Sequence, residues 1–471
     1  MQISSMHFKA NASVKLKDST LQKAMLKAKG KFVDGRAAAM DELGNFEELR
    51  EAGKVIRNRA LENLDVWLMR FEREATARGA IVHWAETGEE VNRIVLEIAR
   101  EHGVKKVIKS KSMVSEECNL NPALESAGIQ VVETDLGEYI LQLANEPPSH
   151  IIAPAVHKTR EQVGDLFAAA HHRERKTDPS ALTREAREVL RPHFMTAEMG
   201  ISGANFLIAE TGSTVMVTNE GNGRMVSTLP PIHVAITGVE KVIPTLEDFT
   251  TLLRLLTRSA TGQPISNYVS VNTGVRSADD PDGPEHFHII LVDSGRTKLL
   301  GTELQAALRC IRCGACMNHC PVYQNVGGHA YGWVYPGPIG SVLTPMYIGL
   351  ENALDLPQAA TLCNECGVVC PVKIPLPELM RVLREKEFEG GMRPWTERLS
   401  MKAWRWAVLR PRAYALLAGM GARLLSIVGG REKLLHKLPG LDGWTDGRDM
   451  PAPSGETFRA AYAKYKKGAG R

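Results

Sequence analysis

From about residue 79 the chain alternates between short apolar runs and longer amphipathic segments. Short apolar runs between turn residues are typical of buried strands, and apolar residues three and four positions apart are typical of helices. We expect strands at 80–85, 104–110, 128–134 and 150–155, and helices at 89–102, from about 115 and at 158–170. Strand–helix repeats of this kind predict a mostly parallel sheet covered by helices.

After about residue 204 the pattern favours strands. Two apolar runs lie on either side of Glu210, Thr211 and Gly212, which predicts a hairpin. The glycine-rich stretch 219–224 is a weak candidate for a phosphate-binding loop, and a surface turn is the favoured interpretation. Further strands are expected at 232–238, 267–274 and 286–293, with a helix at 247–258 and a loop at 278–285.

The pattern divides the chain into four parts. Residues 1–65 read as a helical extension, with Leu21, Met25 and Leu26 forming an amphipathic run. Residues 66–298 carry the α/β pattern, 299–390 carry most of the cysteines, and 391–471 form a basic region. A chain of 471 residues with 44% hydrophobic and 24% charged residues is long enough for two or three domains and is neither disordered nor fibrous.

The last part differs from the rest in charge. Residues 391–471 hold 16 Lys and Arg against 6 Asp and Glu, a net charge of +10, whereas the whole chain carries only +4. Its aromatic residues Trp395, Trp404, Trp406 and Tyr414 either pack on the protein or a partner, which we favour, or lie on an anionic membrane surface. Nucleic acid is not expected as a partner, because no recognised nucleic-acid-binding module accompanies the charge.

Two further classes are excluded by the apolar pattern. The longest apolar stretch, 413–430, is interrupted by Arg423, so no membrane-spanning helix is expected. The amino-terminal residues contain no apolar segment of the kind found in secretory signals.

Seven of the eight cysteines lie between Cys310 and Cys370. Clustered Cys-x-x-Cys spacing is typical of metal or iron–sulfur binding in a reducing compartment, so we expect a cytoplasmic protein. The first motif is Cys310-x2-Cys313-x2-Cys316-x3-Cys320-Pro321, the spacing of bacterial ferredoxins. Gly314 permits the tight backbone turn that successive ligands require.

The second motif is Cys363-x2-Cys366-x3-Cys370-Pro371. In two-cluster ferredoxins the last cysteine of each motif binds the other cluster. This crossing predicts two [4Fe-4S] clusters, with the following ligands. Cluster 1 is assigned Cys310, Cys313, Cys316 and Cys370, and cluster 2 is assigned Cys320, Cys363 and Cys366.

Cluster 2 has three cysteines in this assignment, because Ala360 stands where a fourth would be expected. It is therefore a [3Fe-4S] cluster, or a [4Fe-4S] cluster with a non-cysteine ligand, or a cluster completed by Cys118. Zinc is the alternative metal, but the unbroken first motif fits zinc poorly. Two clusters joined through crossed ligands favour an electron conduit.

The segment 327–340 lies between the motifs and is too rich in Gly and Pro for a helix. It either covers the clusters or forms a docking surface for a redox partner. His329 is a candidate polar contact to the clusters, although a packing role is more common for such a residue.

The motifs CIRCGAC, CPVY, GGHAYG, YPGPIG and CPVKIPL resemble the lactate utilization protein B family, iron–sulfur subunits of a bacterial L-lactate oxidation system. KSKSMVSEE (109–117), ETDLGEYI (133–140) and NFLIAETGSTV (205–215) resemble its LUD domain, which is similar in fold to sugar-phosphate isomerases and CoA transferases. The resemblance implies a LUD α/β domain, then an α-helical ferredoxin-type dicluster domain, then a helical basic region.

The resemblance also implies a function. It points to electron transfer during oxidation of L-lactate to pyruvate, and to two partners, a cysteine-rich iron–sulfur subunit and a second LUD-domain protein. No residue is assigned a catalytic role. Two alternatives stay open: a hydroxy acid is bound and oxidised within the LUD-like domain, or the clusters serve as a redox sensor. The residues considered for substrate binding are Lys109, Ser110, Lys111, His157, Lys158 and Glu210.

Overall fold

The computed structural model describes residues 3–438, 445 and 447–469. It contains two compact units, Met1–Glu387 and Phe388–Arg471. The predicted helical character of residues 1–65 is confirmed for those that the structure describes, and the predicted α/β and cysteine-rich parts belong to the same unit as these helices. The amino-terminal helices are α1 Phe8–Lys15, α2 Ser19–Lys29, α3 Gly35–Asp41, α4 Phe46–Glu62 and α5 Leu64–Thr76.

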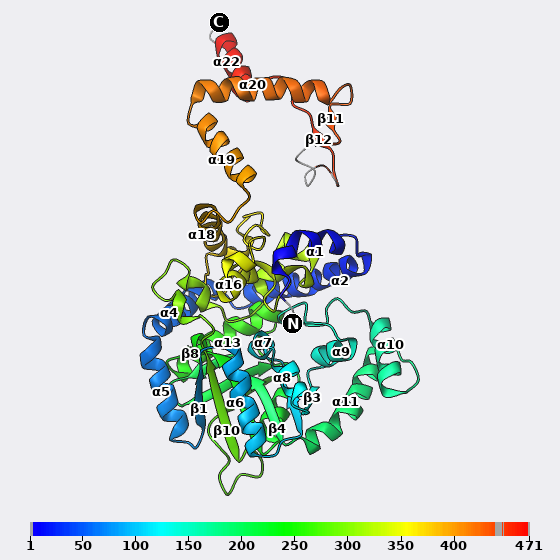
Figure 1. Ribbon diagram of the computed structural model, residues 1–471, viewed down its shortest axis with the longest axis vertical. Helices are drawn as coiled ribbons and strands as arrows, with labels where there is room; N and C mark the ends of the chain where they lie inside the picture. The colour runs from blue at the N-terminus through cyan, green and yellow to red at the C-terminus, as the bar shows by residue number, and fades with distance from the viewer. Residues whose placement is uncertain (1–2, 439–444, 446, 470–471) are drawn as a thin grey trace. The chain divides into compact units, whose positions relative to one another are not determined.

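A six-stranded parallel sheet lies at the centre of the first unit (Figure 1). The side chains of its strands alternate between the two faces: in β10, Phe287 and Ile289 face one core, and Ile290 and Val292 face the other. The apolar sides of helices therefore pack on both faces of the sheet, as is usual for a buried parallel sheet. In sheet order the strands are β1 Ile81–Ala85, β10 His286–Val292, β7 Ile232–Gly238, β4 Met199–Gly203, β2 Lys106–Lys109 and β3 Gln130–Glu133.

The helices that cover one face are consecutive in the chain. One face packs against α6 Gly88–Glu101, α7 Met113–Glu117 and α8 Leu120–Ser126. The other packs against α5 and, beyond it, α9 Leu136–Ala144, α10 Arg160–His171, α11 Pro179–Thr196 and α12 Asn222–Thr228.

A smaller sheet contains the predicted hairpin, which is confirmed. β5 Phe206–Ile208 pairs antiparallel with β6 Ser213–Thr218, and the sheet is completed by β8 Val242–Ile243 and β9 Tyr268–Asn272. Helix α13 Leu246–Thr261 packs between this sheet and α4. The second sheet thereby connects the α/β domain to the amino-terminal helices.

The strand predicted at 150–155 is wrong. This segment is a largely buried loop, in which the His150 Nδ1 atom accepts hydrogen bonds from the backbone N–H groups of Ile152 and Ala153. Pro154 has no N–H to offer a neighbouring strand. The apolar run is buried against the cysteine region, because Ile151 packs in the core that contains those cysteines.

Strand β4 was not predicted, although it lies in the interior of the main sheet. Its sequence, MGISG, has weak strand propensity. Gly200 is needed for packing rather than for pairing, because a Cβ atom there would lie 1.9 Å from the Val226 carbonyl oxygen of α12. The glycine lets this helix approach the sheet closely.

The cysteine-rich part consists of short helices and turns. Segment 327–340 is non-α-helical as far as residue 336, but the expectation fails for its last four residues, since Gly337 opens a helix with Pro338 in its first turn. Proline is tolerated there because the first N–H groups of a helix have no intrahelical partner. The helices are α14 Ala315–Asn318, α15 Pro321–Val326, α16 Gly337–Ile348, α17 Glu365–Val368 and α18 Leu376–Glu389.

The second unit contains α19 Trp395–Val408, α20 Pro411–Val428, α22 Phe458–Ala469 and the strand pair Leu434–Leu435 with Met450–Pro451. Residues 439–444, 446 and 470–471 of the basic region lie outside the described residues. Helices α19 and α20 bury none of their residues, and Trp395 and Trp404 are 72% and 61% exposed. No described helix is long and apolar enough to cross a membrane.

Candidate functional site

Four cysteines, which we call the first cysteine group, line a single cavity. They are Cys310, Cys313, Cys316 and Cys370, the four assigned above to cluster 1. Two sequence segments separated by more than 50 residues are thus folded against each other at this cavity. The other side chains that line it are almost all apolar: Ile151, Ile311, Ile339, Val372, Ile374 and Leu376. Thiol donors in an apolar pocket suit an iron–sulfur cluster.

The remaining three cysteines of the motifs, Cys320, Cys363 and Cys366, form the second cysteine group. Burial and the nearby thiols of Cys320 and Cys363 raise the pKa of Cys366 to about 12. Burial and the Cys363 thiol also raise the pKa of Cys320. Cys316 interacts with Cys366 as well as with its own group, so the two groups are neighbours.

Cys118 belongs to neither group. It is buried in the core between the main sheet and α6, where Asn92 donates a hydrogen bond of 2.9 Å to its carbonyl oxygen. The idea that Cys118 completes cluster 2 is therefore wrong. Within the described residues, no three His, Cys, Asp or Glu side chains converge on a single metal-ion position.

Backbone groups around the cysteines are held by arginines from the amino-terminal helices. Arg50 donates hydrogen bonds to the carbonyl oxygens of Val368 and Cys370, and Arg36 donates one of 2.8 Å to that of Val369. Arg57 likewise donates to the carbonyl oxygens of Leu308 and Arg309, just before the first motif.

Sequence reasoning missed these arginines. The available signal was the seven-residue spacing of Arg50 and Arg57, which places both on one face of α4.

Two backbone N–H groups also reach the thiols: Arg312 N–H donates to Cys310 Sγ, and Ile374 N–H donates to Cys370 Sγ. Such N–H···S contacts favour the reduced state of a cluster.

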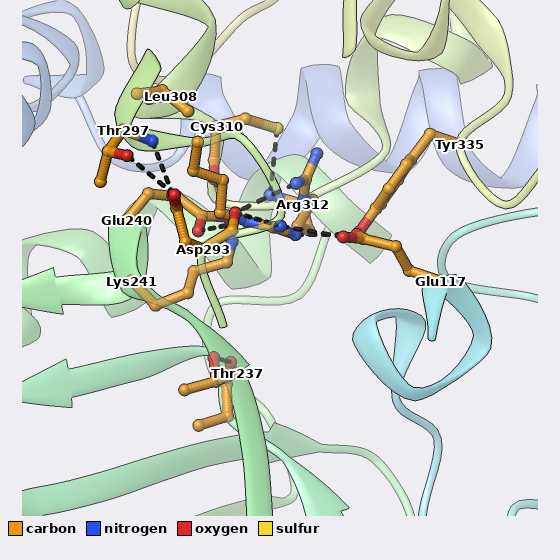
Figure 2. Close-up of polar contacts among 12 residues, drawn as sticks. Glu117, Thr237, Glu240, Lys241, Asp293, Thr297, Leu308, Cys310, Arg312 and Tyr335 are labelled. Atoms are coloured by element: carbon orange, nitrogen blue, oxygen red, sulfur yellow. Dashed lines mark hydrogen bonds and ion pairs between the residues drawn. The ribbon is translucent and has the colours of Figure 1, made fainter. Parts of the chain in front are cut away.

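A buried charge network adjoins Cys310 (Figure 2). We use this name for Arg57, Glu117, Glu240, Lys241, Arg296 and Arg312. Glu240 lies 2.8 Å from Arg296 Nε and 3.5 Å from Arg312 Nη2, and the surrounding positive charges lower its pKa to about 2 despite its burial. Glu117 accepts two hydrogen bonds of 2.8 Å from Arg296 and one of 2.7 Å from the Tyr335 hydroxyl.

The network joins the α/β domain to the first cysteine motif. Lys241, which follows β7, donates a hydrogen bond of 3.1 Å to the Cys310 carbonyl oxygen, and Arg312 stacks on the Tyr335 ring at 4.4 Å. Burial and nearby cations lower the pKa of Lys241 to about 7. Three buried guanidinium groups thus face two carboxylates, and Lys241 adds positive charge when it is protonated. This excess positive charge lies beside thiols that are anionic when they bind iron.

The amino-terminal helices and two tyrosines share a core with Cys320 and Cys366 of the second cysteine group, whereas Cys363 is exposed. Phe8 of α1 lies 5.1 Å from the Tyr331 ring, and Leu21 of α2 lies close to Gly327. The Tyr331 hydroxyl is buried and makes no hydrogen bond within the described part of the chain. Burial and the thiols of Cys320, Cys316 and Cys366 raise the pKa of Tyr331, so its O–H stays protonated beside them.

The candidate polar contact His329 is directed elsewhere. Its Nε2 atom lies 2.8 Å from the Pro147 carbonyl oxygen, and its ring packs edge-on against His157 at 4.5 Å. The packing interpretation of His329 is therefore the correct one.

A second, larger cavity of about 630 Å³ lies where the main sheet meets the cysteine region. It is lined at the carboxyl ends of β2, β4 and β7 by Lys111, Asn205 and Lys241, and on the other side by Ile151 and Arg312. Ile151 and Arg312 also line the cavity of the first cysteine group. The glycine-rich stretch 219–224 is not a plain surface turn, since Asn219, Glu220 and Asn222 line this cavity.

The residues considered for substrate binding do not form one site. Lys109 is buried and paired with Glu133 at 2.7 Å, Lys158 and His157 pair with Glu146, and Glu210 accepts a hydrogen bond from Leu246 N–H. Ser110 and Lys111 alone among them line the large cavity.

Models of three protein families match this chain. A LUD domain matches residues 68–292, a 4Fe-4S dicluster domain matches 306–374, and a domain described as lactate utilisation protein B, C-terminal, matches 379–467. The dicluster match covers all seven cysteines of the two groups, which supports iron–sulfur binding.

Proteins named lactate utilization protein B are similar over nearly the whole chain. The chain is 43% identical to that of Oceanobacillus iheyensis, covering 99% of this chain and 98% of the relative, and 44% identical to that of Bacillus cytotoxicus, covering 99% of both. The Geobacillus kaustophilus relative is 46% identical over 92% of this chain and 91% of its own. A crystal structure of a duf162 family protein from Deinococcus radiodurans matches 49% of this chain and 98% of its own, with 12% identity and a TM-score of 0.29, too low to support an argument.

Proposed function

Because the chain belongs to the lactate utilization protein B family, we propose that it is an iron–sulfur electron-transfer protein in the oxidation of L-lactate to pyruvate. The observation that carries the proposal is the arrangement of the cysteines. Four thiols surround one apolar cavity and three more gather beside it, so two clusters would be held close enough for electrons to pass between them.

In this proposal cluster 1 is held by Cys310, Cys313, Cys316 and Cys370, and cluster 2 by Cys320, Cys363 and Cys366 with a non-cysteine fourth ligand or as a [3Fe-4S] cluster. The clusters supply one-electron redox chemistry. The chain itself supplies the thiolates, the apolar walls that exclude water, and the cations that offset the negative charge of the reduced cluster. No residue of this chain is assigned to break the C–H bond of lactate.

Electron transfer also requires a donor and an acceptor. We propose that the chain works with a cysteine-rich iron–sulfur subunit and a second LUD-domain protein, as the family resemblance implies. Exposed aromatic side chains on α19 and α20 are candidate contacts for such a partner, since this unit does not bury them itself.

The test is anaerobic purification of the full chain, followed by iron and sulfide analysis and EPR before and after reduction. We expect about eight irons per chain, or about seven if cluster 2 has three irons. Cys316→Ala should lower the iron content sharply, whereas Cys118→Ala should leave it unchanged, because Cys118 lies in another core.

The same sample distinguishes the alternatives. Clusters that a chemical reductant reduces but L-lactate alone does not would support a carrier. Direct reduction by L-lactate would contradict a pure carrier and place the oxidation within this chain. A sensor would instead change its partner binding on exposure to air without passing electrons.

A further inference from the structure

The large cavity is built like a small-molecule site. Its volume of about 630 Å³ lies within the usual range for ligand pockets of about 300–1,000 Å³. It lies at the carboxyl ends of parallel strands, where open α/β sheets bind ligands. A three-carbon acid would fill only a small part of it, so the cavity suits a molecule of cofactor size.

The charged lining of the cavity selects an anion. Four basic side chains, Lys31, Lys111, Lys241 and Arg312, face two acidic ones, Asp135 and Glu220. Burial raises the pKa of Glu220 and lowers the pKa values of Lys111 and Lys241, so a bound anion would stabilise the charged forms of both lysines.

Several donors in the cavity are unused by the protein. Arg312 Nη1 is buried without a hydrogen-bond partner in the described residues. Lys111 forms no hydrogen bond or ion pair within the same part of the chain, although burial lowers its pKa. A ligand with a negative group would pair these cations in a setting where each pairing is strong.

The remaining lining suits an aromatic body. Phe32, Met113, Met216, Ile236 and Leu256 contribute apolar surface, and serine, threonine, asparagine and charged side chains make up much of the remaining lining. A planar organic cofactor would lie against the apolar surface while its polar edges meet these groups.

The cavity also lies beside cluster 1. Ile151 and Arg312 form part of both cavities, so a molecule in the large one would be separated from the first cysteine group by single side chains. A redox-active occupant would therefore exchange electrons with cluster 1 directly.

We infer that the large cavity binds a flavin nucleotide, a planar redox-active organic anion, next to cluster 1. This rests on the proposed function, because it joins a two-electron oxidation in a partner to clusters that each accept one electron. The partner that oxidises the 2-hydroxy acid would deliver the electron pair to the flavin as a hydride, and the hydroxyl proton would leave to solvent. The reduced flavin would then give two single electrons to cluster 1 in turn and release the one proton that arrived with the hydride.

The test is equilibrium dialysis of the anaerobically purified full chain against flavin mononucleotide, with riboflavin as the matched probe that lacks only the phosphate. We expect one flavin mononucleotide per chain and at least tenfold weaker binding of riboflavin. Lys111→Gln should weaken flavin mononucleotide binding about tenfold and reduce the preference over riboflavin. Lys298→Gln, which changes an exposed lysine outside the cavity, should alter neither.

Absence of flavin binding, equal binding of the two probes, or an unchanged affinity in Lys111→Gln would overturn the inference. Iron analysis and EPR of the same samples separate it from the proposed function. Full clusters without flavin binding would refute the flavin site alone, and specific flavin binding without clusters would refute the electron-transfer proposal alone.

Discussion

Tyr331 is the residue whose surroundings most directly suggest a redox role. Its protonated hydroxyl is buried without a hydrogen-bond partner in the described chain and interacts electrostatically with the thiols of Cys320, Cys316 and Cys366. The neighbouring Tyr323 hydroxyl instead donates a hydrogen bond of 2.7 Å to the Ser149 carbonyl oxygen. Hydrogen bonds to cluster sulfur raise the reduction potential. The hydroxyl of Tyr331 is therefore placed to favour reduction of the adjacent cluster.

We predict that Tyr331→Phe lowers the midpoint potential of one cluster by about 59 mV, a tenfold change in a one-electron equilibrium. EPR-monitored redox titration measures it. Tyr323→Phe is the matched control, since its hydroxyl hydrogen is already donated to a carbonyl, and it should leave both potentials in place. Equal shifts in the two variants would refute the assignment.

The charge network makes a prediction about stability. Glu117→Gln removes a buried carboxylate that two hydrogen bonds join to Arg296 and one joins to Tyr335. Breaking a buried pair leaves its partner charge uncompensated, so we expect a loss of about 3–5 kcal/mol in the free energy of unfolding. Chemical denaturation followed by circular dichroism measures it.

The control for this prediction is Glu97→Gln, which breaks the exposed pair of Glu97 with Arg93 on α6. Exposed helix pairs contribute about 0.3–0.5 kcal/mol. A loss in Glu117→Gln as small as the loss in Glu97→Gln would contradict the structural importance of the network.

His233 in β7 predicts how stability depends on pH. Burial lowers its pKa to about 3, from an ordinary value of about 6.5. Below pH 6.5 the unfolded chain binds a proton that the folded chain does not, so the free energy of unfolding falls as the pH falls. When the pH falls from 7.5 to 5.5, the free energy of unfolding should decrease by about 1 kcal/mol less in His233→Gln than in the wild type. An identical decline would show that His233 is not kept neutral.

At the scale of elements, close packing between α12 and the main sheet depends on Gly200. An added Cβ atom would lie 1.9 Å from the Val226 carbonyl oxygen, which belongs to backbone and does not move easily. We expect Gly200→Ala to lower the free energy of unfolding by about 1–3 kcal/mol or more.

The contrasting variant is Gly419→Ala in α20, where the described residues place no atom within 4 Å of the added group, apart from the adjoining backbone of the helix itself. Alanine is the better helix former, so this change should stabilise its unit by about 0.5–1 kcal/mol. Thermal unfolding of both variants tests the pair, and a harmless Gly200→Ala would show that α12 is free to move away.

At the scale of the whole molecule, the cysteines and the basic region belong to different compact units. All seven cysteines of the two groups precede residue 387, the last residue of the first compact unit. We predict that a chain ending at Gly390, which keeps α18 whole, retains the iron content of the full chain and loses partner capture. Loss of iron on truncation would show that the second unit completes a cluster.

Much of the site could be predicted from the sequence. The ferredoxin-like spacing of the motifs predicted that Cys370 joins Cys310, Cys313 and Cys316, because the last cysteine of each ferredoxin motif binds the other cluster. The structure places these four thiols around one cavity. The hairpin after Phe206 and the strands of β7 and β10 were predicted because their apolar period and turn residues are local properties.

The remaining features depend on tertiary contacts. The apolar run at 150–155 has the sequence pattern of a strand, but it is buried against the cysteine region and not in a sheet. The sequence of β4 has a weak strand pattern because Gly200 is required for the close packing of α12. Arg50 and Arg57 donate to carbonyl oxygens near the cysteines that are more than 200 residues away in the chain, and the spacing of the arginines alone does not reveal those carbonyl groups.

The sequence by itself therefore determined the chemistry of this protein, since thiols at ferredoxin spacing and alternating apolar runs are local signals. Only the tertiary structure decided what surrounds that chemistry. Three features arise where distant segments meet. They are the burial of Cys118 in another core, the charge network beside Cys310, and the large cavity that shares Arg312 with the cavity of the first cysteine group. Burial and pairing depend on the neighbours of a residue in space, and those neighbours are set by the whole fold.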